Sequence, residues 1–191
     1  VAAGGQNSKN LEVMLNTKKV NVNAQTRPGL TPNGETALID AALHCFDKNV
    51  SLLLNAGANV DIQDAYGNTA MTKCLQGSIR DPTDHNDPFK TLKLLIDANT
   101  NPFLQTRKGN LTPLMLARTL KYDKFWKGWE KRKEGVISLL LKHEQKYEIE
   151  LKVAKHTKEE KKKKEREEYE RMSSEEKNVK TLADNGAINA K

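Results

Sequence analysis

Three nine-residue segments of this chain share one pattern, and their spacing limits the folds that the chain can adopt. They read GETALIDAA from Gly34, GNTAMTKCL from Gly67 and GNLTPLMLA from Gly109. In each, a glycine is followed by threonine, a small residue and a large apolar residue. Threonine can cap the free N–H groups at the start of a helix, and proline suits the first helical position, where no N–H donor is needed. Each segment therefore predicts the start of a helix.

A second apolar segment follows each of the three and predicts a second helix. These second segments cover residues 49–64, 91–106 and 135–145. Gly34 and Gly67 lie 33 residues apart, and the second-helix positions Val50, Leu92 and Val136 lie 42 and 44 residues apart. Ordering one residue costs roughly 1–2 kcal/mol of backbone entropy, and one buried aliphatic side chain returns about 1.5–3 kcal/mol. A single helix pair is therefore not expected to fold alone, and the pairs must stack.

These motifs resemble the ankyrin repeat, a 33-residue unit of two helices with the signature T-P-L-H-x-A. TPLMLA (112–117) differs from it only at Met115, which replaces the histidine, and TALIDA (36–41) differs at the proline and the histidine. LLLNAGANVDIQD (52–64) is similar to the helix, turn and hairpin that end a repeat. The resemblance implies an all-α solenoid of stacked helix-turn-helix units with hairpin loops and enlarged insertions between the helices.

The resemblance also divides the chain into five units. They are a truncated first repeat (1–33), a repeat of ordinary length (34–66), a repeat with an insertion (67–108), a repeat with a basic and aromatic insertion (109–146) and a degenerate repeat with a long charged insertion (147–191). In the first unit, residues 10–25 resemble a second helix with its hairpin. In the last, residues 149–156 are expected to form a first helix and residues 178–191 a second helix with its hairpin.

The insertions lie between the two helices of their units, at residues 77–89, 121–134 and 157–177. Ankyrin helices join on the side away from the hairpins, so the resemblance implies that the insertions project together as a ridge. The segment 158–171 holds seven basic and six acidic residues, with Glu160 four residues before Lys164 and Glu167 four before Arg171. This spacing predicts a solvated helix with side-chain ion pairs. Heptad leucines are missing, which disfavours a coiled coil.

Composition and charge narrow the classes of function. Aromatic residues make up only 5% of the 191 residues, which favours thin layers of Leu, Ala and Val over one aromatic core. No run of 18 apolar residues predicts a membrane span. Cys45 and Cys74 are the only cysteines, which argues against a disulfide scaffold or a zinc site and favours a reduced, cytoplasmic location. The net charge of +7 is uneven, because residues 118–133 hold seven basic residues and two acidic ones.

The family's recognition surface consists of the hairpin tips and the exposed positions of each first helix. Aligning the repeats on Thr36, Thr69 and Thr112 transfers this surface to the present chain. The first-helix positions are then Asp40, Leu43, His44, Lys73, Gln76, Leu116, Thr119 and Leu120, and the residues on or near the tips are Tyr66, Asn68, Arg107 and Lys108. The same alignment places Leu38, Ala41, Met71, Cys74, Leu114 and Ala117 on the buried side. Exposed leucines predict an apolar groove for a peptide or helix, unless long neighbouring side chains cover them.

The second insertion combines aromatic and basic side chains. They are Phe125, Trp126, Lys127, Trp129 and Arg132. Tryptophan with basic neighbours is typical of interface anchors and of single-strand binding. One reading is that the rings pack back against the next repeat. Others are that they contact an acidic protein, or that the basic residues bind RNA or anionic lipid, although no nucleic-acid motif accompanies them.

Two further groups of residues contain side chains that can bind metals or act in catalysis, but their patterns favour neither role. Asp81, Asp84, His85 and Asp87 lack the mid-loop glycine and terminal glutamate of a calcium loop, so a polar, proline-bounded loop is expected there and no metal. His44 and Cys45 are adjacent, so on a helix they point about 100° apart, and no partner acid is identifiable. The two cysteines are read as small packing residues. The sequence predicts no catalytic residue and no cofactor.

The sequence therefore favours a monomeric, non-catalytic scaffold that binds a protein partner through the concave groove and the inserted loops. A second reading is a substrate-recruiting fragment of a larger enzyme, or of a bacterial effector secreted into a host cytosol. A third is RNA or anionic-lipid binding through residues 118–133.

Overall fold

A computed structural model describes residues 8–17, 19–27, 34–77, 88–119 and 129–171, with only the backbone for 129–132. This part of the chain forms seven helices and no strand. The helices are α1 (Ser8–Asn16), α2 (Ala37–Leu43), α3 (Asp47–Asn55), α4 (Ala70–Gly77), α5 (Pro88–Asp97), α6 (Pro113–Thr119) and α7 (Trp129–Arg171). The all-α class predicted from the sequence is confirmed. By its internal contacts the chain divides into two units, residues 1–147 and 148–191.

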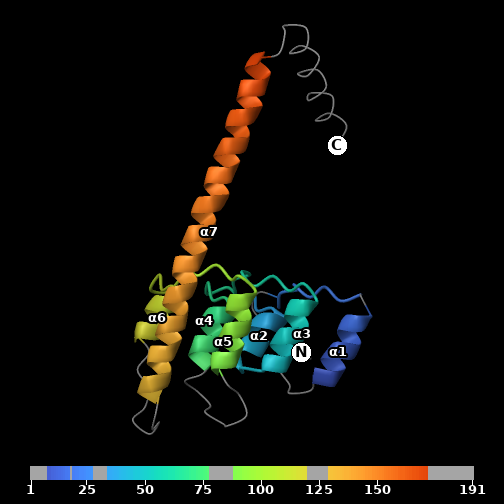
Figure 1. Cartoon of the computed structure of the whole chain (residues 1–191). Coiled ribbons are helices and arrows are strands. Elements are labelled where there is room, and N and C mark those ends of the chain that lie inside the picture. The colour runs from blue at the N-terminus through green and yellow to red at the C-terminus, as the bar shows by residue number, and fades with distance from the viewer. Residues whose placement is uncertain (1–7, 18, 28–33, 78–87, 120–128, 172–191) are drawn as a thin grey trace. The chain divides into compact units, whose positions relative to one another are not determined.

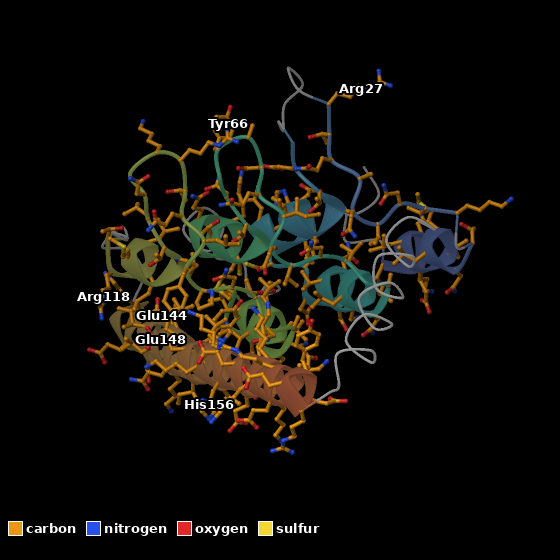
Figure 2. All side chains as sticks on the ribbon, turned by 90° about the horizontal axis from the view of Figure 1, so that it is seen from above. Arg27, Tyr66, Arg118, Glu144, Glu148 and His156 are labelled. Carbon is orange, nitrogen blue, oxygen red and sulfur yellow. The ribbon has the colours of Figure 1, made fainter. Side chains whose placement is uncertain are left out.

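The first unit is built from two rows of helices. Helices α2, α4 and α6 pack side by side in one row, and α1, α3 and α5 in the other. The rows are joined because α2 packs on α3 and α4 packs on α5. Seen from above, the hairpin loops extend from the α2–α4–α6 row on the side opposite the second row (Figure 2). This is the stack of helix pairs with hairpins that the resemblance implies (Figure 1).

The repeated threonines begin the helices of the first row. The hydroxyl of Thr36 accepts from the backbone N–H of Ile39 at 3.2 Å, that of Thr69 from Thr72 at 3.4 Å and that of Thr112 from Met115 at 3.3 Å. These bonds satisfy N–H groups that the first turn of a helix leaves free. The capping predicted from the three nine-residue segments is therefore confirmed.

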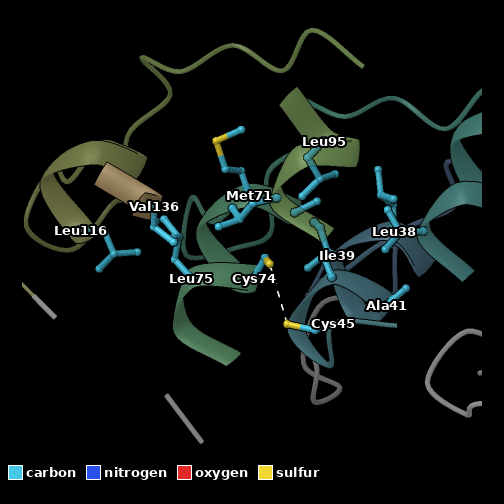
Figure 3. Packing of buried hydrophobic residues seen from close by; sticks show 14 of the residues in the cluster. Leu38, Ile39, Ala41, Cys45, Met71, Cys74, Leu75, Leu95, Leu116 and Val136 are labelled. Carbon is cyan, nitrogen blue, oxygen red and sulfur yellow. Dashed lines mark hydrogen bonds between the residues drawn. The ribbon is translucent and has the colours of Figure 1, made fainter. Parts of the chain in front are cut away.

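The core lies between the two rows (Figure 3). All six positions predicted on the buried side are buried: Leu38, Ala41, Met71, Cys74, Leu114 and Ala117. The thiols of Cys45 and Cys74 are both buried and lie 3.8 Å apart, so the two cysteines pack between adjacent repeats as predicted.

Leu116 does not have the predicted exposure. Its side chain is only 7% exposed and belongs to the same buried cluster as Val136 and Leu140 of α7. The prediction of an exposed leucine here was wrong because α7, which begins within the second insertion, covers this side of α6. Lys133 of that helix also donates from Nζ to the backbone oxygen of Arg118 at 3.1 Å.

Two glycines allow the backbones of neighbouring repeats to approach closely. A Cβ on Gly77 would lie 1.7 Å from the backbone oxygen of Leu43, so α4 contacts the end of α2 without an intervening side chain. Gly67 has φ +77°, and a Cβ there would lie 2.7 Å from the amide nitrogen of Arg107. Both contacts require glycine, one because of space alone and the other because of space and the left-handed backbone.

Helix α7 corrects the expected organisation of the last two units. It is continuous from Trp129 to Arg171, so residues 129–134 of the second insertion belong to the helix. The separate first helix expected at 149–156 was wrong, because these residues lie inside α7 and all of them are exposed. No glycine or proline occurs between Val136 and Arg171 to end the helix.

The solvated helix predicted for 158–171 is confirmed, but the ion pairs described in it are not the predicted Glu160–Lys164 and Glu167–Arg171. Every side chain from Glu148 to Arg171 is exposed. Ion pairs four residues apart join His156 to Glu160 (3.3 Å), Lys161 to Glu165 (3.9 Å) and Lys163 to Glu167 (3.8 Å), with the histidine charged only when protonated. Residues 78–87 and 120–128, which hold most of the first two insertions, lie outside the described residues, as does the half-unit at 178–191, so the expected ridge stays a prediction.

Candidate recognition surface

Two glutamines, Gln25 and Gln63, align the hairpins of successive repeats. The side-chain amide of Gln25 donates to the backbone oxygens of Gly34 (2.7 Å) and Gln63 (3.0 Å). The amide of Gln63 repeats this pattern with Gly67 (2.8 Å) and Gln105 (2.9 Å). Each glutamine therefore closes its own hairpin and holds the next one in register.

A second set of bonds links the turns before the hairpins. The backbone N–H of Asn59 donates to the side-chain oxygen of Asn23 at 2.7 Å, and the N–H of Asn101 donates to that of Asp61 at 2.8 Å. At the tips, the N–H of Arg107 donates to the backbone oxygen of Tyr66 at 2.8 Å. Because these bonds join residues about one repeat apart, the hairpins form a connected frame.

Polar groups beside the second hairpin are joined in one network. Nζ of Lys73 lies 2.5 Å from Oε1 of Glu35 and 3.3 Å from Oδ2 of Asp64, whose side chain is fully buried. Nδ2 of Asn68 donates to Oδ2 of Asp64 at 2.9 Å, and Nε2 of Gln76 donates to Oδ1 of Asn68 at 3.1 Å. Charges removed from water need such partners.

This network includes three of the residues that were predicted to contact a partner. Lys73 and Gln76 are half-buried and Asn68 is buried, and the side chains of all three bond within the protein. The sequence reasoning missed Glu35 and Asp64, which hold Lys73. Glu35 lies next to the capping threonine, and this was the available signal for its position beside the next repeat.

Other predicted positions do face solvent. Tyr66 is 59% exposed, and Arg107 and Lys108 on the neighbouring hairpin are exposed. Tyr66 and Arg27 lie at the hairpin ends, on the side away from the second row (Figure 2). Thr119 is also exposed, and its hydroxyl donates to the backbone oxygen of Leu116 at 2.9 Å.

At the α2 end of the surface, the predicted contact residues differ in their exposure to solvent. Asp40 and Leu43 are half-buried, and the exposed ring of His44 stacks on Phe46 with centroids 5.3 Å apart. Nε2 of His44 lies 3.8 Å from Oδ1 of Asp40, so Asp40 is the acid beside this histidine that the sequence reasoning did not identify. The thiol of Cys45 is buried against Cys74, so it is not presented to solvent with this pair. Met115, which replaces the motif histidine, is 46% exposed and was not among the predicted contact residues.

Several predicted residues have no described side chain. Leu120, Phe125, Trp126 and Lys127 lie outside the described residues, as do Asp81, Asp84, His85 and Asp87. Trp129 and Arg132 lie in α7, where only the backbone is described. Within the described ranges, no three His, Cys, Asp or Glu side chains are grouped so that they could hold a metal ion. Of the helices described, none has a stretch long and apolar enough to cross a membrane.

Comparison with known proteins identifies the repeat. The ankyrin-repeat family model matches residues 33–65. A protein of Acanthamoeba polyphaga mimivirus, whose name describes it as an ankyrin repeat protein, is 34% identical over 65 residues. The aligned region covers 34% of this chain and 11% of that relative. These matches show an ankyrin repeat at residues 33–65, and the capping threonines and the stacked helix pairs are consistent with an ankyrin-repeat fold.

Proposed function

We propose that this chain is a non-catalytic scaffold, acting as a monomer in a cytoplasm, that binds a protein partner on the concave side of its stack. The contact surface consists of the exposed first-helix positions and the hairpin tips. Ankyrin repeats generally mediate protein–protein interaction, and this general role supports the proposal.

The observation that carries the proposal is the contrast between the tips and their base. At the base, Gln25 and Gln63 hold consecutive hairpins in register. At the tips, the ring of Tyr66 is exposed beside Arg107 and Lys108. A large aromatic side chain held in water by a rigid frame loses little entropy on binding, which is the character of an interface anchor.

Site-specific photo-crosslinking in the full chain tests this surface. A benzophenone amino acid at position 66 should capture a protein partner from cytosol. The same probe at Lys93, an exposed position on α5 in the other row, is the matched control. Equal capture from both positions, or capture from Lys93 alone, contradicts binding on the concave side.

Two alternative functions predict different results, and each has its own measurement. A substrate-recruiting part of a larger enzyme or effector would deliver its cross-linked partner for modification, which mass spectrometry of that partner detects. RNA or anionic-lipid binding through residues 118–133 would weaken steeply with salt and collapse when Lys127, Lys131 and Arg132 are changed to glutamate. Partner binding through the hairpins should survive those three changes.

A further inference from the structure

The exposed charges at the hairpin tips have one sign. Arg27, Arg107 and Lys108 are exposed, Arg27 at the end of the described part of the first hairpin and the other two on the tip of the third. Together with Tyr66 on the hairpin between them, we name these side chains the hairpin edge. Its composition is basic at both ends and aromatic in the middle.

The acidic residues of the described hairpins already form bonds within the protein. Asp64 is fully buried in the network with Lys73 and Asn68. Asp61 is half-buried, and its Oδ1 accepts the N–H of Asn101. The cations of the edge therefore have no exposed carboxylate beside them within these described hairpins, which leaves a surface suited to an acidic ligand.

The tips of the second and third hairpins are also fixed in position. Gly67 at the Tyr66 turn has φ +77° and no room for a side chain, and the Arg107 amide bonds to Tyr66. Packed helices lie about 8–10 Å apart, so the first and third hairpins are separated by roughly 16–20 Å. An extended peptide rises about 3.3 Å per residue and covers this distance with about five to six residues.

Building on the proposed function, we infer that the hairpin edge binds an extended acidic segment of the protein partner. The segment carries acidic residues about five to six positions apart, which meet Arg27 at one end and Arg107 with Lys108 at the other. An apolar or aromatic residue between them packs on Tyr66.

A nucleic acid fits this surface less well. One strand of a duplex carries a phosphate about every 3.4 Å, so several phosphates would lie along the edge. The neighbouring surface presents Asp40, and the network below holds two carboxylates, Glu35 and Asp64, against the one ammonium of Lys73. A peptide can place its few carboxylates only at the cations, whereas a phosphate chain has no such choice.

Selection of displayed random 12-residue peptides on the full chain tests the inference. Enriched peptides should carry paired acidic residues around an apolar one. Their affinity should fall by about tenfold or more in the Arg107→Glu, Lys108→Glu double variant, because rim charges of opposite sign are replaced by repulsion. The matched control is Lys48→Glu with Lys93→Glu, which changes the net charge equally on exposed positions of α3 and α5. The control should bind normally.

The variants are compared with the parent chain by circular dichroism, and Arg107→Gln with Lys108→Gln provides a milder change. Enriched peptides without acidic residues, or acidic peptides that bind the edge and control variants equally, overturn the inference. So does a labelled 20-nucleotide single-stranded RNA that binds more tightly than the peptides and is lost on edge reversal. Absence of any enriched peptide also overturns it. Continued cross-linking from position 66 would in each case leave the proposed function standing, and its loss would remove that function as well.

Discussion

The repeat stack and the helix at residues 148–171 are both helical, but they are stabilised differently. In the stack, short helices of seven to ten residues bury leucines between two rows, and side chains bond one hairpin to the next. In the segment 148–171 every side chain is exposed, and the ion pairs described there are local, four residues apart. The stack therefore depends on long-range contacts, whereas the exposed helix depends on local ones. Substitutions should therefore affect the two regions very differently.

The largest expected difference concerns buried and exposed leucines. Leu95→Ala in α5 removes a fully buried side chain and should lower the free energy of unfolding by about 4 kcal/mol. Leu151→Ala in the exposed helix should change it by less than about 0.5 kcal/mol, because that side chain is 41% exposed. Urea unfolding followed by circular dichroism measures both. Equal losses at the two sites would remove the distinction between the regions.

A smaller effect is expected from Gly77, which tests the close contact between α2 and α4. Gly77→Ala should cost about 3 kcal/mol because the added methyl would overlap the backbone oxygen of Leu43. Gly57→Ala is the control, since a Cβ there meets nothing within 4 Å. It should cost only about 1–2 kcal/mol, because Gly57 has a left-handed backbone conformation that alanine adopts less readily. If Gly57→Ala proves the more destabilising change, the two repeats do not approach as described.

The glutamine bonds should contribute less than the core. Gln63→Ala removes two side-chain hydrogen bonds and should cost about 1–2 kcal/mol. Gln145→Ala, at an exposed position of α7, should be close to neutral. Thermal unfolding of both variants measures the difference. A neutral Gln63→Ala would show that the hairpins do not need this bond to stay in register.

The smallest effect is expected for an ion pair in the exposed helix. Glu165→Gln breaks the contact with Lys161 and should leave the urea midpoint of the chain unchanged, because both groups are well solvated. A slight loss of the 222 nm signal at low salt is expected, and it should disappear at 1 M NaCl. A shifted midpoint would mean that this helix contributes to the stability of the stack.

Local patterns predicted the parts of the fold that depend on local chemistry. The threonine positions marked the starts of α2, α4 and α6, because capping needs only residues within one turn. The alignment of the repeats also placed Leu38, Met71 and the other inward positions correctly, since one face of each helix must be buried.

Contacts between distant residues could not be predicted in this way. The pairing of Lys73 with Glu35 joins residues 38 apart, and nothing in either helix alone indicates it. Leu116 lost its expected exposure because a later helix covers it. The separate helix predicted at 149–156 does not form, because an uninterrupted run of helix formers continues α7 through these residues. The partner-binding role of the predicted site residues stays a prediction.

Hydrogen exchange of individual backbone amides tests the central claim, that the hairpins form a frame held in register. The amides of Asn59, Asn101 and Arg107 lie outside helices and donate to the neighbouring repeat, so they should open only with the stack and exchange slowly. Amides of residues 148–171 should exchange faster, although they are helical, because no packed neighbour protects them. If the three loop amides exchange as fast as, or faster than, those of 148–171, the hairpins are not joined and the account is contradicted.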